Sequence, residues 1–148
     1  MRANGFELWV FRRRGDGDVE YLVFEGGDSE SNPYGSAEIG FVPNGFVEGD
    51  PLDALRACTA SMGLAPLAFW FGEHAFTTFD FRHGGVTHFT VFAAEVAGES
   101  PTPSGAMWFA RKDAEMRIYG RGSAEGLYWV RRTIVEATHG APVRLWTA

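Results

Sequence analysis

The pattern of hydrophobic and polar positions first predicts an opening β-hairpin. Residues 6–11 and 20–24 are rich in the β-branched, aromatic and aliphatic side chains that favour strands. The segment between them, residues 12–18, contains the Gly and Asp residues that suit a turn. The first quarter of the chain is therefore expected to fold back on itself as two antiparallel strands.

Similar runs predict the strands that follow. A short strand is expected around residues 38–42, and Pro43-Asn44-Gly45 then predicts a tight turn. The later strand predictions are residues 67–72, 75–82 and 86–95, with Gly84-Gly85 as a two-residue turn before the last of them.

The clearest helix signal begins at Asp50. Asp is a favourable N-cap, Pro51 suits the first helical position, and Gly63 suits the position after the last turn. These signals predict a helix over about residues 51–62. At ~100° per residue its apolar side, expected to face the core, carries Leu52, Leu55, Cys58, Thr59 and Met62. Its opposite side carries Asp53, Ala57, Ala60 and Ser61.

A second helix is predicted over about residues 124–139, because Leu127, Val130, Ile134 and Ala137 recur at spacings of three and four. Residues 107–110 lead into a short helical turn from about Asp113, which precedes it. Strands before and after a helix, without regular alternation, indicate an α+β fold in which helices pack on a mixed sheet. No repeat or long linker divides the chain, so residues 1–148 are expected to form a single domain.

Composition narrows the classes of partner. The net charge of -6 arises from dispersed acidic residues, which would repel a nucleic-acid backbone; an Arg-lined pocket for a small phosphate ligand is still compatible with it. The lone Cys58 cannot form an intrachain disulfide, and the N-terminus does not resemble a signal peptide. No apolar run approaches the ~20 residues needed to cross a bilayer. A cytoplasmic location without membrane contact is therefore expected.

The first helix and the loop before it resemble the Nudix box, whose pattern is G-x5-E-x7-R-E-U-x-E-E-x-G-U, with U a bulky aliphatic residue. Residues 41–49, Phe-Val-Pro-Asn-Gly-Phe-Val-Glu-Gly, are similar to the loop that precedes the Nudix helix, and Arg56, Gly63 and Leu64 match the end of the box. The spacing from Gly45 to Gly63 is 63 - 45 = 18, three shorter than in the family. The opening hairpin, the strand at 86–95 and Trp108-Phe109 also follow the family's order. The resemblance covers nearly the whole chain and implies an α/β/α sandwich.

The resemblance lacks the family's metal ligands. Aligned on Gly63, Ala57, Ala60 and Ser61 stand where Nudix enzymes have the glutamates that hold Mg²⁺ against the substrate diphosphate. Alanine provides no ligand and serine only a weak neutral one, so no metal site of the family's kind is expected. Asp53, one turn earlier, is a lone carboxylate. Mg²⁺ or Mn²⁺ is expected as a cofactor only if activity is retained.

Other residues become candidates through the same resemblance. Arg56 resembles the box arginine and is expected to pair with Glu48 or Asp50. Carboxylates outside the box, Glu38, Glu73 and Asp80, are candidates for a displaced acidic cluster. The candidate catalytic residues are Glu48, Arg56 and Glu73, and the candidate ligand-binding residues are Glu38, Asn44, Phe46 and Asp53. The histidines at 74, 83 and 88 lack the spacing of a zinc site.

Three functions follow as hypotheses. In the first, the chain recognises a nucleotide or other diphosphate-linked ligand and has lost most of its Mg²⁺-dependent pyrophosphohydrolase activity. In the second, it is an active pyrophosphohydrolase of the dinucleoside polyphosphate type with displaced carboxylates. In the third, it is an interaction or assembly module, for example a homodimer. The small side chains at 57, 60 and 61 would then let a loop or a partner chain approach the helix.

Overall fold

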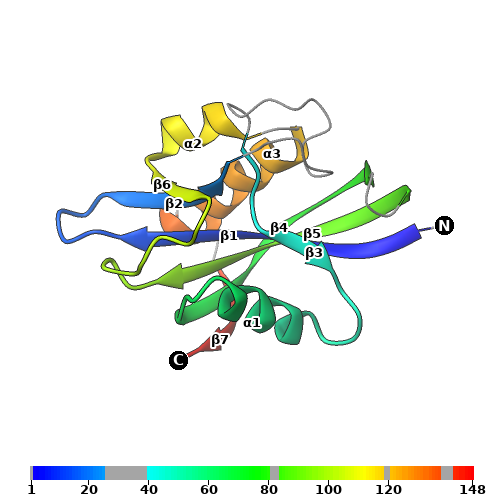
Figure 1. Ribbon diagram of the computed structural model, residues 1–148, viewed down its shortest axis with the longest axis horizontal. Helices are drawn as coiled ribbons and strands as arrows, with labels where there is room; N and C mark the ends of the chain where they lie inside the picture. Colours follow the sequence, from blue (N-terminus) through cyan, green and yellow to red (C-terminus); the bar gives the residue numbers. More distant parts are fainter. Residues whose placement is uncertain (1, 26–39, 81–83, 119–120, 138–141) are drawn as a thin grey trace.

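The computed structural model describes residues 2–25, 40–80, 84–118, 121–137 and 142–148. Within them the chain forms one seven-stranded sheet with helices on both faces (Figure 1). The strands are β1 (Arg2–Arg13), β2 (Val19–Phe24), β3 (Asn44–Phe46), β4 (Pro66–Asp80), β5 (Gly85–Val96), β6 (Ala106–Phe109) and β7 (Val143–Thr147). The helices are α1 (Pro51–Ser61), α2 (Arg111–Arg117), α3 (Arg121–Val130) and the π-helical η1 (Arg131–Val135). This mixed sheet with helices on its faces confirms the predicted α+β class.

The sheet is organised around β1. The strand order is β6-β2-β1-β5-β4-β7, and β3 pairs separately with β1. β1 runs parallel to β5, with Leu8 opposite Phe92, and antiparallel to β2 and β3. Because both faces of β1 are covered, its sequence is an almost continuous apolar run rather than an alternating one.

Alternate residues of β1 supply two cores. Leu8 and Val10 face the α1 side, where they pack in a cluster with Leu55. Trp9 and Phe11 face the opposite side, where the cluster includes Leu127 of α3. In Figure 1, α1 lies on one side of the sheet, and α2 and α3 lie on the other. No helix of the described residues is long and apolar enough to span a membrane.

Helix α1 matches its prediction. Asp50 is the N-cap, its Oδ1 accepting a hydrogen bond from the Leu52 backbone N–H at 3.0 Å, and Pro51 opens the helix. Gly63, with φ of 70°, follows the C-cap in the left-handed region that glycine adopts readily. Leu55 and Thr59 are buried, as expected for the core-facing side.

The predicted turn at Pro43-Asn44-Gly45 is wrong, because residues 44–46 form β3 and pair with Gly5–Glu7 of β1. A glycine is needed at position 45 because the Phe6 ring packs against it. A Cβ at that position would lie 3.0 Å from the ring of Phe6, and Gly45 does not have a positive φ. Of the strand expected at 38–42, residues 38 and 39 lie outside the described residues, while Gly40 and Phe41 form isolated bridges.

Three other boundaries differ from the predictions. The strands expected at 67–72 and 75–82 form a single strand, β4, which extends to residue 80 and has an irregular register between Phe71 and Ala75. Strand β7, which pairs with β4, was not predicted. The helix expected at 124–139 begins at Arg121 and changes to a π-helical turn at Arg131. Ala137, with φ of 50°, is outside the right-handed helical region, which ends the helical run before residue 139.

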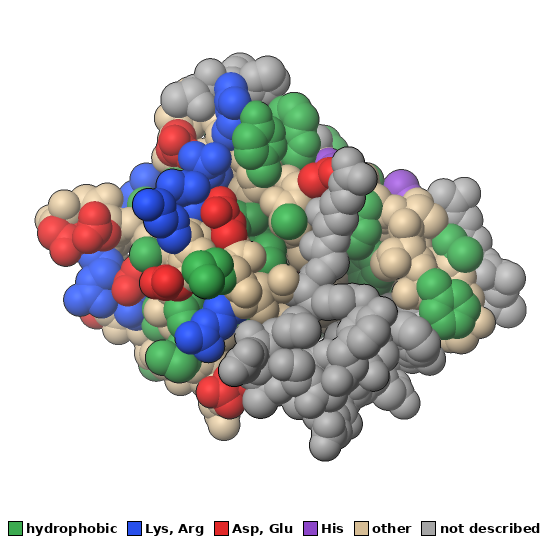
Figure 2. All heavy atoms as spheres, turned by 90° about the horizontal axis from the view of Figure 1, so that it is seen from above, with side chains coloured by type: hydrophobic (Ala, Val, Ile, Leu, Met, Phe, Trp, Pro, Cys, Tyr) green, Lys and Arg blue, Asp and Glu red, His purple; other side chains and the backbone are tan. Residues whose placement is uncertain are grey.

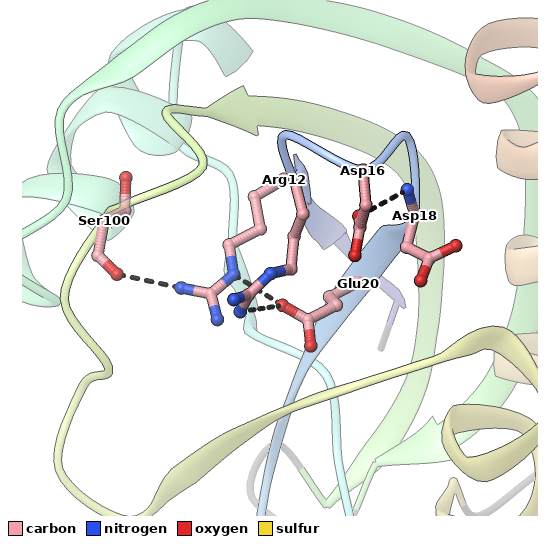
Figure 3. A network of polar contacts seen from close by, with 6 residues as sticks. Arg12, Asp16, Asp18, Glu20 and Ser100 are labelled. Atoms are coloured by element: carbon pink, nitrogen blue, oxygen red, sulfur yellow. Dashed lines mark hydrogen bonds and ion pairs between the residues drawn. The ribbon is translucent and has the colours of Figure 1, made fainter.

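An arginine network fixes the β1–β2 hairpin (Figure 3). Arg12 Nε contacts Glu20 Oε1 at 2.8 Å, and its Nη1 donates to the Ser100 carbonyl at 3.0 Å. The Arg12 guanidinium also stacks on Trp108, 4.3 Å from the ring centroid. Arg14 donates to the same Glu20 oxygen at 3.3 Å. The network therefore ties the hairpin to the loop before β6.

Candidate functional site

The exposed side of α1 presents small side chains. Asp53, Ala57, Ala60 and Ser61 are all exposed, and Ser61 Oγ donates to the Cys58 carbonyl at 2.7 Å. In the part of the chain that the structure describes, no group of three or more His, Cys, Asp or Glu residues is arranged to hold a metal ion. Two methyl groups and a bonded hydroxyl do not fit Mg²⁺, which takes oxygen ligands, usually carboxylates. No described loop covers this side of the helix.

The candidate Arg56 does not make its predicted ion pair. The guanidinium of Arg56 lies over the Trp146 ring, 5.1 Å from its centroid, and no ion pair with Glu48 or Asp50 is present among these described side chains. Asp50 is instead engaged in capping α1, and Glu48 is exposed. The aromatic ring of β7 therefore takes the place of the expected carboxylate.

The three acidic candidates from outside the box cannot be placed. Glu38 lies outside the described residues, and Glu73 and Asp80 lie in β4 with side chains that are outside the description. Asn44 and Phe46, in contrast, are well placed on β3. Glu7 is paired with Asn44, and Gly5 is paired with Phe46, so all four positions share one face of the sheet.

That face carries a buried carboxyl that the sequence did not single out. Glu7 is only 4% exposed, and Ser123 Oγ of α3 donates a hydrogen bond to its Oε1 at 2.5 Å. Burial raises the pKa of Glu7 from 4.5 to about 7, an effect only partly offset by hydrogen bonding from Ser123 and Trp9. Glu7 is therefore a carboxyl that keeps its proton far more readily than an exposed glutamate.

Three buried polar atoms on this face have no hydrogen bond of good geometry to another described residue. They are Glu7 Oε2, Trp9 Nε1 and Asn44 Oδ1. A buried polar atom without a hydrogen bond costs about 1–3 kcal/mol, so such atoms are rarely left this way without a reason. Glu7 Oε2 and Trp9 Nε1 are polar neighbours, and the contact from Trp9 lowers the pKa of Glu7.

Helix α3 covers Glu7 and Trp9. A Cβ on Gly126 would lie 2.9 Å from Glu7 Oε2 and 3.2 Å from Trp9 Nε1. Glycine is therefore the residue that allows α3 to approach the polar cluster. The neighbouring Glu125 Oε2 lies 3.6 Å from His74 Nε2 of β4, which adds a second link between the helix and the sheet.

Aromatic rings border the polar atoms. Phe76 and Phe89 stack with their centroids 5.4 Å apart, and the Phe46 ring is 41% exposed. A Cβ at Gly5 would lie 2.8 Å from the Phe89 ring, so this glycine accommodates the ring. We call the group formed by Glu7, Trp9, Asn44 and Phe46 the β1–β3 cluster. Polar atoms beside apolar rings are the usual composition of a small-molecule site.

A separate cavity lies at the other end of β1. It has a volume of about 580 Å³ and is lined by Arg12, Arg13, Arg14, Gly15, Gly98 and Glu99. The arginines already have partners: Arg12 and Arg14 bind Glu20, and Arg13 lies 3.6 Å from Glu95. Their charges are therefore largely compensated within the protein. In Figure 2, which views the α2 and α3 side, acidic and basic side chains are likewise intermixed.

Comparison with known proteins identifies the fold. No sequence profile of a known family and no curated protein sequence matches the chain. A Nudix hydrolase structure from Listeria monocytogenes is similar with a TM-score of 0.69 and 12% identity, covering 89% of this chain and 94% of that one. The Ap4A hydrolase of C. elegans is similar with a TM-score of 0.64 and 15% identity, covering 90% and 99%.

A third similar structure contains a ligand. The Nudix domain of Shewanella oneidensis NrtR, complexed with ADP ribose, has a TM-score of 0.65 and 11% identity, covering 90% of this chain and 89% of that one. The chain therefore has the Nudix fold, as its resemblance to the Nudix box implied.

Proposed function

We propose that this protein recognises a nucleotide or another diphosphate-linked ligand and has lost most or all of the Mg²⁺-dependent hydrolysis associated with its fold. One observation carries the proposal. Helix α1, with its N-cap Asp50, is the helix whose sequence resembles the Nudix box, yet its exposed side presents Ala57, Ala60 and Ser61. Without carboxylates there, a divalent ion has no ligand set to hold it against a diphosphate.

The β1–β3 cluster supports ligand recognition independently of hydrolysis. Asn44 and Glu7 provide acceptors, Trp9 provides an indole N–H, and Phe46 exposes a ring on which a base can stack. Similar folds accommodate such ligands, because the NrtR Nudix domain was crystallised with ADP ribose. Binding and chemistry would then depend on different parts of this protein, the β1–β3 cluster and α1.

Calorimetry with ADP-ribose and diadenosine tetraphosphate tests the proposal. At least one is expected to bind, and Phe46→Ala is expected to weaken that binding about tenfold, because stacking contributes on the order of 1–3 kcal/mol per base. Met116→Ala, on the exposed surface of α2, is the matched control and should leave binding unchanged. Failure of both ligands and of a broader nucleotide panel would refute ligand recognition.

Turnover is measured on the same samples with Mg²⁺ and with Mn²⁺. No release of nucleoside monophosphate above the metal-free rate is expected. Efficient metal-dependent release would instead favour an active enzyme with displaced carboxylates. In that case, loss of activity in Glu48→Gln or Glu73→Gln would identify the acidic residue responsible.

A further inference from the structure

The start of α3 is held on a carboxyl, whereas the rest of the helix is held on apolar side chains. Ser123 Oγ donates to Glu7 Oε1, and Gly126 brings the helix backbone against the same carboxyl. One turn later, Leu127 and Val130 are fully buried in the core. The two parts of α3 therefore depend on different forces, and only the first part depends on the charge of Glu7.

No fixed positive charge faces Glu7 from the described residues around it. Its neighbour on β1 is Trp9, its β3 partner is the neutral Asn44, and its β5 partner is Val91. Among the side chains that the structure describes on the other elements packed here, the titratable ones are His74 of β4 and Glu125 of α3, which lie 3.6 Å from each other. Within that described set, an ionised Glu7 would have Ser123 and Trp9 as polar neighbours and no guanidinium or ammonium group.

A buried carboxylate without a cation is strongly unfavourable. Two outcomes can relieve it: the group keeps its proton, or the surrounding structure opens and lets water reach it. The first part of α3 is the local cover whose movement would expose Glu7 without disturbing Leu127 and Val130.

We propose that the contact between Glu7 and the first turn of α3 is a proton-controlled latch, closed while Glu7 is protonated and opened when Glu7 ionises. Opening moves the Ser123–Gly126 segment away from β1 and exposes Glu7 and Trp9 to solvent. If the β1–β3 cluster is the ligand site, as the proposed function has it, the latch also controls access to that site. The latch itself does not depend on that assignment.

Amide hydrogen exchange followed by NMR tests the latch without any ligand. The pH is varied through about 7, where burial places the pKa of Glu7. Protection of the first-turn amides of α3 is compared with that of α1, so that the general pH dependence of exchange cancels. In the wild-type protein, relative protection of α3 is expected to fall by up to about tenfold per pH unit between about pH 4.5 and 7, because the opened form releases the Glu7 proton over that range while the closed form still holds it, and to level off above about pH 7. The indole N–H resonance of Trp9 should shift as Glu7 titrates near pH 7.

Variants separate Glu7 from its surroundings. Glu7→Gln keeps a neutral side chain of the same size and is expected to remove the pH dependence, whereas Glu99→Gln, an exposed carboxyl elsewhere, should retain it. His74→Gln should also retain it; its loss there would assign the effect to the His74–Glu125 pair and overturn the proposal. Constant relative protection in the wild-type protein would overturn it as well, even if Glu7→Gln did not fold. Neither result bears on whether nucleotides bind.

Discussion

At the scale of single residues, Glu7 makes stability depend on pH. The folded protein holds the proton of Glu7 up to about pH 7, whereas the unfolded chain releases it near 4.5. Between these values the folded state binds more protons than the unfolded state, so the free energy of unfolding falls as pH rises. The fall is about 3 kcal/mol, complete above about pH 7. Urea denaturation should show this loss in the wild-type protein relative to Glu7→Gln, and parallel curves for the two proteins would contradict it.

The surroundings of some of these residues could be predicted from the sequence, and those of others could not. The small side chains at 57, 60 and 61 were placed on one side of the helix by counting along it, and the exposure of that side agrees with its helical periodicity. The burial of Glu7 could not be predicted, because it depends on Ser123, which is 116 positions away along the chain. A carboxyl within the apolar run from Phe6 to Phe11 is the one sequence signal that indicated its unusual surroundings.

At the scale of elements, α1 presents the small side chains of Ala57, Ala60 and Ser61 on its exposed side. Replacing Ala57, Ala60 and Ser61 together with Glu should create a carboxylate cluster on the exposed side of the helix, because positions three and four apart are neighbours there. Mn²⁺ binding followed by electron paramagnetic resonance should be stronger than in the wild-type protein by at least about tenfold. A triple Gln variant is the matched control. Equal Mn²⁺ binding by the Glu and Gln variants would show that α1 is not positioned as proposed.

The elements differ in how far local sequence determines them. Helix α1 was predictable because its end signals, the N-cap Asp50 and Gly63 after the C-cap, act within one turn. Strand β3 was not, because Gly45 serves the packing of Phe6 rather than a turn. Strand β7 pairs with β4 in an irregular register between Phe69 and Trp70, and a short edge strand of this kind leaves little periodic signal.

At the scale of the whole molecule, the charge of -6 and the intermixed surface charges determine how strongly the protein binds a polyanion. Binding to duplex DNA at physiological salt is expected to be absent, since a basic face that releases counterions is needed for it. Fluorescence anisotropy with a labelled duplex measures this directly. Saturable, salt-sensitive binding would show that the arginines around the hairpin cavity are more accessible to phosphate than their ion pairs indicate.

The parallel pairing of β1 with β5 also determines when the protein can fold during its synthesis. Leu8 and Phe92 are 92 - 8 = 84 positions apart, so the central strand stays without its parallel neighbour until more than half of the chain has been made. Contacts between residues so far apart in the sequence slow folding, and apolar segments stay exposed until their partner strands have been made. The apolar segment from Phe6 to Phe11 is thus exposed to aggregation on the ribosome until β5 has been made.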